Sequence, residues 1–393
     1  MRTVRIAHIS DSHLGYAGHD IQSYVEDPSN PGTKITQRAA DIAQAFERTI
    51  DLILHGDRPD LVIHSGDLFD SARPAASTID LAMRQISRLT REDIPILIVE
   101  GNHSYPRDRA MGHVLRLLEY ISGVTVVCEE YAHTQLDRFD LLIHSLPHAA
   151  LMAGAKPTIE CINKKCWNVL VAHGVVDGMP FFKTGRPAPP VPLQSCDDWY
   201  HYIALGHYHQ FCQPNLHPCA FYAGAPTMVT WGDFTAGHAF SFNLVTFADE
   251  EATFKRVTIP GRQLYGYGLD DARGLSAAEI LTLVGRQRDA LPPSGAYCLV
   301  EIRQVDPRAR DELSRAEVED LFLDAAALKV TLEASIPVWK ATQNAQQAIG
   351  SPTERYVELV GMMDGDERFR NEVLGLGNEL LEEAASALAA GDE

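Results

Sequence analysis

Long apolar runs are missing from this sequence of 393 residues. No segment approaches the roughly 18 uninterrupted apolar residues that a membrane-spanning helix needs. The first residues, Met1–Ile6, lead directly into an apolar strand, without the apolar core and the small-residue cleavage site of a signal peptide. We therefore expect a cytoplasmic protein.

Cysteines are few and do not form a metal-binding pattern. The chain has seven of them, an odd number scattered over a large protein, which is typical of free thiols in a reducing compartment. Cys161 and Cys166, followed by Cys196, Cys212 and Cys219, raise the question of a zinc site, but their spacing fits neither a zinc ribbon nor a zinc finger. We therefore favour free thiols over structural zinc.

Positive charge is also scarce. Lys and Arg total 34 against 53 Asp and Glu, so the formal net charge is −19. A protein with this balance does not coat nucleic acid through bulk electrostatics, although metal ions and a local basic patch can still supply positive charge where one phosphate binds. The sequence also lacks a Gly-x4-Gly-Lys-Ser/Thr loop, so any dependence on ATP must come from a partner.

The length of the chain favours two or three domains. Up to about residue 259, short apolar runs that end in polar clusters alternate with helical patterns at Gln37–His55 and Ala75–Thr90. This alternation is typical of an α/β layered fold. The rest of the chain reads as a small α+β unit at 260–340, a linker rich in Ala, Gln, Gly and Pro at 341–352, and two helical segments within 353–393.

Five polar clusters each follow an apolar run. In chain order they are Asp11-Ser12-His13, Gly66–Asp70, Gly101-Asn102-His103, Ala172-His173-Gly174 and Gly206–His209. Open α/β sheets bind their ligands at the carboxyl ends of the strands. Residues two apart in extended chain point the same way, so Asp11 and His13 are expected to converge, as are His207 and His209. One such cluster alone is most often a polar strand end or a turn, but five in this order predict a metal centre.

The types of ligand favour two metal ions. Such pairs lie roughly 3.5–4 Å apart and need a bridging group, and Asp67 is suited to this because a carboxylate offers two oxygens. Two divalent cations with the carboxylates of Asp11 and Asp67 leave a site near +2 (4 − 2), suited to a phosphodiester monoanion and a hydroxide. A shell rich in imidazole favours Mn²⁺, Fe²⁺, Co²⁺ or Zn²⁺ over Mg²⁺ and Ca²⁺.

The motifs resemble those of the calcineurin-like metallophosphoesterase superfamily and, within it, the SbcD-type DNA-repair nuclease subunits. The narrower resemblance rests on Asp11–Tyr16, on Gly66–Asp70 with Pro74, on Tyr202–His209, and on Tyr222–Pro226 with Trp231 and Asp233. It is strong over residues 1–247, weaker over 260–340 and thin beyond. The resemblance implies a four-layer αββα sandwich of the α/β class, with a small α+β capping domain at 260–340 and C-terminal helices.

The resemblance also implies roles for single residues. One metal ion would take Asp11, His13, Asp67 and His209, and the other would take Asp67, Asn102, His173 and His207. His103 matches the family's proton donor for the departing 3′ oxygen. Two positions depart from the usual pattern: Ser104 replaces the Asp that normally follows the Asn-His pair, and position 70 is Asp, as in bacterial members. Without a carboxylate at position 104, we expect the pKa of His103 to fall and its role as an acid to weaken.

We predict a Mn²⁺-dependent DNA nuclease with exo- or endonuclease activity in double-strand break and end processing. Two metal ions would activate water for in-line attack on phosphorus while His103 assists the leaving group. The alternatives are a phosphodiesterase or phosphatase acting on a nucleotide or a protein, and a non-catalytic scaffold. The predicted capping domain and C-terminal helices favour DNA, because a small substrate requires neither.

Two segments are candidates for binding partners. The loop Phe181–Pro187 interleaves aromatic and basic residues, so we consider Lys183 and Arg186 as DNA contacts, against the alternative of a solvated loop with packed phenylalanines. Within Arg368–Ala390, apolar residues recur at three- and four-residue steps and form one stripe. The resemblance implies that these helices bind the coiled-coil base of an SMC-like ATPase of the SbcC type, and that the nuclease is a homodimer. Packing of the helix on its own domain or at the dimer interface is the alternative.

Overall fold

The structure is a computed structural model. It describes residues 3–18, 24–27, 32–106, 112–155, 165–176, 189–192, 200–215 and 217–335, with residues 360, 373–375 and 377 further along. By its internal contacts the chain divides into two units. The first comprises Met1–Gly268, Leu281–Glu301 and Ser314–Thr331, and the second Leu269–Ile280, Ile302–Leu313 and Leu332–Glu393. The domain boundaries expected from the sequence stay a prediction.

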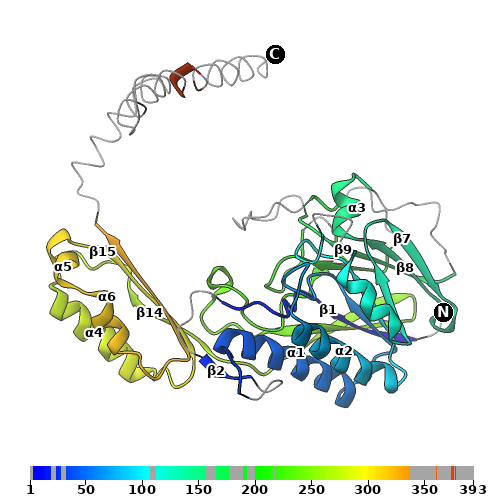
Figure 1. The fold of residues 1–393 in the computed structure, drawn as a ribbon, viewed down its shortest axis with the longest axis horizontal. Helices are drawn as coiled ribbons and strands as arrows, with labels where there is room; N and C mark the ends of the chain where they lie inside the picture. Colours follow the sequence, from blue (N-terminus) through cyan, green and yellow to red (C-terminus); the bar gives the residue numbers. More distant parts are fainter. Residues whose placement is uncertain are drawn as a thin grey trace. The chain divides into compact units, whose positions relative to one another are not determined.

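A six-stranded sheet forms one half of the first unit (Figure 1). Its order is β13 (Glu251–Thr258), β12 (Ser241–Ala248), β1 (Val4–Ile9), β4 (Leu61–His64), β5 (Ile96–Val99) and β6 (Val124–Val127). The four strands from β1 to β6 are parallel, and β12 and β13 are antiparallel additions at one edge. Strands β4 and β5 are buried along their whole length, which is why they appear in the sequence as continuous apolar runs.

Two helices cover one face of this sheet (Figure 1). Helix α1 (Gln37–His55) begins after Thr36, whose side chain accepts the N–H of Ala39, and α2 (Ala76–Arg91) packs beside it. In β1, Ala7 and Ile9 pack with the helices, whereas the alternate residues Val4 and Ile6 belong to a separate core against the second sheet. The period of two in the strand thus places the sheet between two layers.

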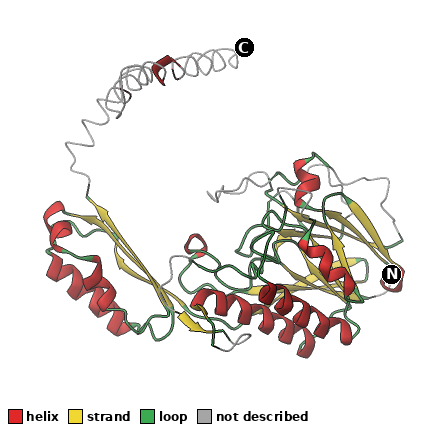
Figure 2. Ribbon diagram, viewed as in Figure 1, coloured by secondary structure: helices red, strands yellow, loops and turns green. Residues whose placement is uncertain are grey.

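A five-stranded sheet forms the other half. Its order is β11 (Ala220–Tyr222), β10 (Tyr202–Gly206), β9 (Trp167–His173), β8 (Leu141–Leu146) and β7 (Ala132–Leu136), with only β7 antiparallel. The short helix α3 (His148–Met152) packs on its outer face through Leu151. The layers are therefore helix, sheet, sheet and helix (Figure 2), as the sequence predicted.

The remaining elements are smaller. Strands β2 (Tyr24–Glu26) and β3 (Lys34–Thr36) form a two-stranded ribbon. Strands β14 (Leu264–Leu269), β15 (Tyr297–Val305) and β16 (Ala327–Ala334) form a three-stranded sheet. The helices in this part of the chain are α4 (Ala277–Ala290), α5 (Pro307–Glu312) and α6 (Arg315–Asp320). Two further short helices used below are η2 (Val114–Tyr120) and η6 (Trp231–Asp233).

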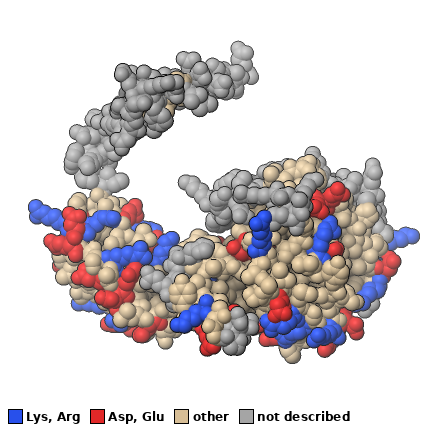
Figure 3. Space-filling model, viewed as in Figure 1, with Lys and Arg blue, Asp and Glu red and all other residues tan. Residues whose placement is uncertain are grey.

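Two features of the whole chain bear on function. Of the helices that the structure describes, none is long and apolar enough to cross a membrane. On the face shown in Figure 3, basic and acidic side chains of the described residues are interspersed rather than gathered by sign. On this face the described residues therefore form no broad basic surface for binding phosphate.

Candidate metal centre

The seven predicted ligands lie at the carboxyl ends of strands from both sheets. Asp11 and His13 follow β1, Asp67 follows β4, Asn102 follows β5, His173 ends β9, and His207 and His209 follow β10. The first five of these side chains are buried, and the last two are partly exposed. The contacts described below connect all seven, so the two sheets bring residues from five separate motifs to one place.

The backbone at the site is unusual. Asp11, His13, Asp67 and His207 have φ values of 51°, 45°, 52° and 111°, a region that non-glycine residues seldom adopt and that costs of order 1–3 kcal/mol each. Asp11 and His13 do converge as expected, because their ligand atoms lie within 4.8 Å of each other, but they converge from a left-handed backbone and not from extended chain. Both strands end before these residues, and turns beyond the strands direct each side chain separately.

Glycine is required at two positions beside the ligands. A Cβ atom on Gly66 would lie 2.1 Å from Nδ1 of His173, and one on Gly101 would lie 2.2 Å from Oδ1 of Asp67. Gly66 also has a φ of 109°, which favours glycine. These two glycines allow the turns after β4 and β5 to approach the ligands closely.

Two histidines from different sheets face each other at one side of the site. Nε2 of His13 lies 3.1 Å from Nε2 of His209. The other ring nitrogens face carboxylates: Nδ1 of His13 is 3.0 Å from Asp70, and Nδ1 of His209 is 2.9 Å from Asp233. Because a carboxylate only accepts, each Nδ1 carries the proton and each Nε2 presents a lone pair. Two lone pairs at this distance repel each other unless a cation or a proton lies between them.

A second convergence lies on the other side of Asp67. Nδ1 of His173 donates to the Ser65 carbonyl at 2.9 Å, so its Nε2 presents a lone pair. That atom lies 3.0 Å from Oδ1 of Asn102 and 3.1 Å from Oδ2 of Asp67. Nδ1 of His207 lies 3.2 Å from the same Asn102 oxygen. Lone pairs from three kinds of ligand thus meet here, as they do around a bound metal ion.

Two carboxylates connect the two sides. Oδ2 of Asp67 lies 3.1 Å from Nε2 of His173 and 3.8 Å from Nε2 of His13. Asp11 belongs to both groups as well, because its ligand atom lies within 4.8 Å of those of His13 and His209, and also within 4.8 Å of those of Asp67 and His173. The arrangement provides two adjacent positions that share carboxylates, which is what a pair of metal ions requires.

The electrostatics of the site favour positive charge. Burial lowers the pKa of His173, but the Asp67 carboxylate outweighs burial and raises this pKa to about 9. Burial likewise opposes protonation of His209, and the Asp233 carboxylate raises its pKa to about 9. Burial and the neighbouring His173 lower the pKa of His207 to about 3. Divalent cations supply the charge that these carboxylates favour while the imidazoles stay neutral, so the residues present fit a metal pair.

His103 lies beside the ligands without joining their convergence. Its backbone N–H donates to Oδ1 of Asp67 at 2.9 Å, and its Nδ1 lies 2.9 Å from the Asp70 carbonyl and 3.2 Å from an Asp70 carboxylate oxygen. Nδ1 therefore carries a proton, and Nε2 is the atom from which a second proton can be transferred.

The expected fall in the pKa of His103 is wrong. Burial lowers this pKa, but the hydrogen bond that the ring donates to Asp70 and the charge of Asp67 outweigh burial and raise it. Ser104 is fully buried, and Asp70 supplies the carboxylate that position 104 lacks. The sequence identified Asp70 and Asp233 as parts of motifs but did not show that they orient ring nitrogens. Lys183 and Arg186 lie outside the described residues, and their contact with DNA stays a prediction.

The comparisons with known proteins agree with this fold and site. A family model of calcineurin-like phosphoesterases matches residues 4–241, more than half of the chain. The protein belongs to the calcineurin-like phosphoesterase family. This membership confirms the predicted αββα fold and the predicted class of enzyme, a phosphoesterase. The fold family uses a pair of divalent metal ions, and the two groups of ligands described above fit such a pair.

Three curated relatives are DNA double-strand break repair proteins Mre11 from archaea. The protein of Methanococcus maripaludis is 29% identical over 213 residues, covering 53% of this chain and 52% of the relative. That of Thermoplasma acidophilum is 26% identical over 268 residues, covering 64% of each. That of Methanosarcina acetivorans is 22% identical over 377 residues, covering 92% of this chain and 55% of the relative. The chain thus spans about half to just under two thirds of these relatives, and the predicted resemblance to DNA-repair nucleases is confirmed.

Proposed function

We propose that the protein is a metal-dependent DNA nuclease that processes the ends of double-strand breaks, with Mn²⁺ as the working metal. The observation that carries this proposal is the convergence of imidazole, amide and carboxylate lone pairs on two adjacent positions, with His103 beside them. The relatives named for DNA double-strand break repair support DNA as the substrate. A shell with several imidazoles favours Mn²⁺ over Mg²⁺.

We assign the ligands as the resemblance implies. One metal ion is held by Asp11, His13, Asp67 and His209, and the other by Asp67, Asn102, His173 and His207. When bound, the metal pair supplies Lewis acidity and a nucleophile at neutral pH.

The other polar residues of the site position the ligands and the proton donor. Asp70 and Asp233 hold His13 and His209 in the tautomers that leave each Nε2 free. Asp70 also holds Nδ1 of His103, so that Nε2 is left to protonate the departing 3′ oxygen of the cleaved strand.

One assay distinguishes the proposed nuclease from a phosphodiesterase of small substrates and from a non-catalytic scaffold. Hydrolysis of plasmid DNA, single-stranded DNA and bis-p-nitrophenyl phosphate is measured with Mn²⁺ and after chelation. We expect Mn²⁺-dependent hydrolysis of all three, lost on chelation, because the phosphodiester is common to them. Hydrolysis of the small ester alone would indicate a phosphodiesterase of small substrates, and hydrolysis of none would indicate a scaffold. The intact set of ligands favours an enzyme.

We further propose that the segment 353–393 binds an SMC-like coiled-coil ATPase of the SbcC type and that the nuclease is a homodimer. Residues 360, 373–375 and 377 of this segment are helical, and its other residues lie outside the described part of the chain. The apolar stripe in the sequence supports this proposal, because a helical pair of this size buries little surface by itself.

Truncation at Gly350 tests the role of this segment. We expect the truncated protein to keep its dimer and its activity on short DNA, and to lose co-purification with the ATPase, because the ligands all lie before residue 210. The measurements are nuclease activity, mass by light scattering and a pull-down with the ATPase. Aggregation or loss of the dimer would instead show that the helices are structural.

A further inference from the structure

A buried arginine of α1 lies outside the motifs that predicted the metal centre. Arg38 is only 1% exposed. Its guanidinium lies 4.1 Å from the ring centroid of Tyr297 and 5.5 Å from that of Trp231. Its NH1 donates to the Met228 carbonyl at 3.2 Å. A guanidinium combines planar stacking with directed hydrogen bonds, which a lysine cannot reproduce. Arg38 therefore fixes both the start of the segment Met228–Phe234 and the indole ring within it.

The same segment carries the carboxylate that faces His209. Oδ2 of Asp233 lies 2.9 Å from Nδ1 of His209 and accepts from the backbone N–H of Thr230 at 2.7 Å. The next residue after His209 is tied to the segment too, because Nε2 of Gln210 donates to the Asp233 carbonyl at 3.3 Å. Asp233 belongs to η6, a single turn whose residues are all at least partly exposed. The position of its carboxylate therefore depends on what holds the turn from behind.

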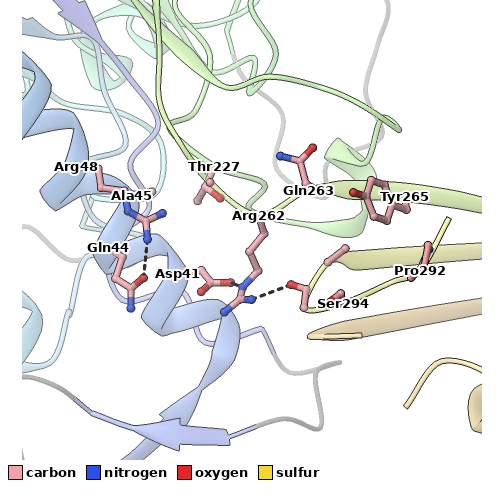
Figure 4. A pocket seen from close by; sticks show the side chains of 13 residues that line it. Asp41, Gln44, Ala45, Arg48, Thr227, Arg262, Gln263, Tyr265, Pro292 and Ser294 are labelled. Atoms are coloured by element: carbon pink, nitrogen blue, oxygen red, sulfur yellow. Dashed lines mark hydrogen bonds and ion pairs between the residues drawn. The ribbon is translucent and has the colours of Figure 1, made fainter. Parts of the chain in front are cut away.

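One partner of Arg38, Tyr297 of β15, is itself held by Asp41 of α1. The hydroxyl of Tyr297 and Nε of Arg262 both contact Oδ2 of Asp41, and NH1 of Arg262 donates to the Gly295 carbonyl at 2.8 Å. Asp41 and Arg262 line a cavity of about 370 Å³. Figure 4 shows both residues there, with Arg48 further along α1 from Asp41. These contacts hold the Tyr297 ring in place against the Arg38 guanidinium.

We propose that Arg38 is a positioning residue for the metal centre and that it orients His209 through Trp231 and Asp233. The inference rests on the proposed role of His209 as a ligand. The residue that accepts the second N–H of a metal-binding imidazole fixes the orientation of its ring, and changing it typically weakens metal binding by 10- to 100-fold. Asp233 is the carboxylate that faces the second ring nitrogen of His209, at 2.9 Å, and Arg38 holds the turn that presents Asp233.

The test is the affinity for Mn²⁺, measured by electron paramagnetic resonance titration of the full-length protein without DNA. Arg38→Met keeps much of the side-chain volume and removes the planar charge. We expect it to weaken binding of Mn²⁺ by about 2- to 30-fold, the range for residues that act through a packed network. Arg48→Met is the matched control, since Arg48 is on the same helix but donates hydrogen bonds to the Pro260 carbonyl and to Gln44. The affinity of this variant for Mn²⁺ should equal that of the parent.

A double-mutant cycle shows whether Arg38 acts through Asp233. In an Asp233→Asn background, Arg38→Met should weaken Mn²⁺ binding no further, because the route to His209 is already broken. If Arg38→Met does not fold, Trp231→Leu at a partly exposed site carries the same expectations. Parental affinity in the single variant, or an equal loss in both backgrounds, would overturn the proposal. A parent that binds Mn²⁺ but cleaves no DNA contradicts the nuclease function and leaves this inference intact.

Discussion

Asp67→Asn is expected to abolish phosphodiester hydrolysis and to remove at least one of two bound metal ions. Asp67 is 2% exposed, and its Oδ2 lies between His13 and His173. An amide offers one oxygen and no charge, so it cannot bridge two cations. Loss of several kcal/mol of charge stabilisation corresponds to a fall in kcat of roughly 10³-fold or more.

The substitution is designed to spare the fold. Asparagine has the shape of aspartate and still provides an oxygen that can accept the His103 N–H. The measurements are kcat with Mn²⁺, the number of Mn²⁺ ions bound per chain, and circular dichroism. Asp57→Asn is the matched control and should leave all three unchanged. Asp57 is exposed, pairs with Lys255, and precedes β4, whereas Asp67 follows it. Full activity of Asp67→Asn with a parental spectrum would contradict the two-metal assignment.

His207→Ala extends the same expectation to the other sheet. His207 contacts Asn102 at 3.2 Å, and alanine removes its imidazole altogether. His207 directly follows β10 and is partly exposed, so it is not part of the apolar core. We therefore expect loss of hydrolysis with the fold retained. Parental turnover in this variant would remove His207 from the set of ligands while leaving the role of Asp67 untouched.

The sequence predicted the metal centre because each ligand follows an apolar strand and the strands of parallel sheets end at a common edge. That reasoning required only local patterns, and it located Asp67, Asn102 and His173 correctly at strand ends. It did not predict how Asp11 and His13 are aimed, because their left-handed backbone is stabilised by tertiary contacts. The N–H of Asp11 donates to the backbone carbonyl of Gly66, and that of His13 donates to the backbone carbonyl of Asp67.

The role of Arg38 could not be predicted from local sequence patterns, for a different reason. The contact between Arg38 and the Met228 carbonyl joins residues 190 positions apart, and no periodicity in either segment indicates it. A single arginine in an amphipathic helix pattern is normally a solvated residue. Its burial follows only once Tyr297 and Trp231 are placed beside it.

His103→Gln is expected to lower kcat for DNA by about 10²- to 10⁴-fold, the usual contribution of general acid catalysis, while metal binding stays at the parental level. The reason is that His103 contacts Asp67 through its backbone N–H, whereas its ring contacts Asp70. The side chain is therefore not needed to complete the two groups of ligands. Glutamine retains a polar side chain of similar reach but has no proton to transfer at neutral pH.

Comparison of two leaving groups separates protonation from substrate positioning. The 3′ oxygen of DNA is a strong base when it departs and needs a proton, whereas p-nitrophenolate is stable as an anion. His103→Gln should therefore retain most of its activity on bis-p-nitrophenyl phosphate and lose it on DNA. His55→Gln, at an exposed histidine at the end of α1, is the control and should act on both substrates as the parent does. An equal loss on both substrates would show that His103 positions the phosphate, and parental cleavage of DNA would place the proton donor elsewhere.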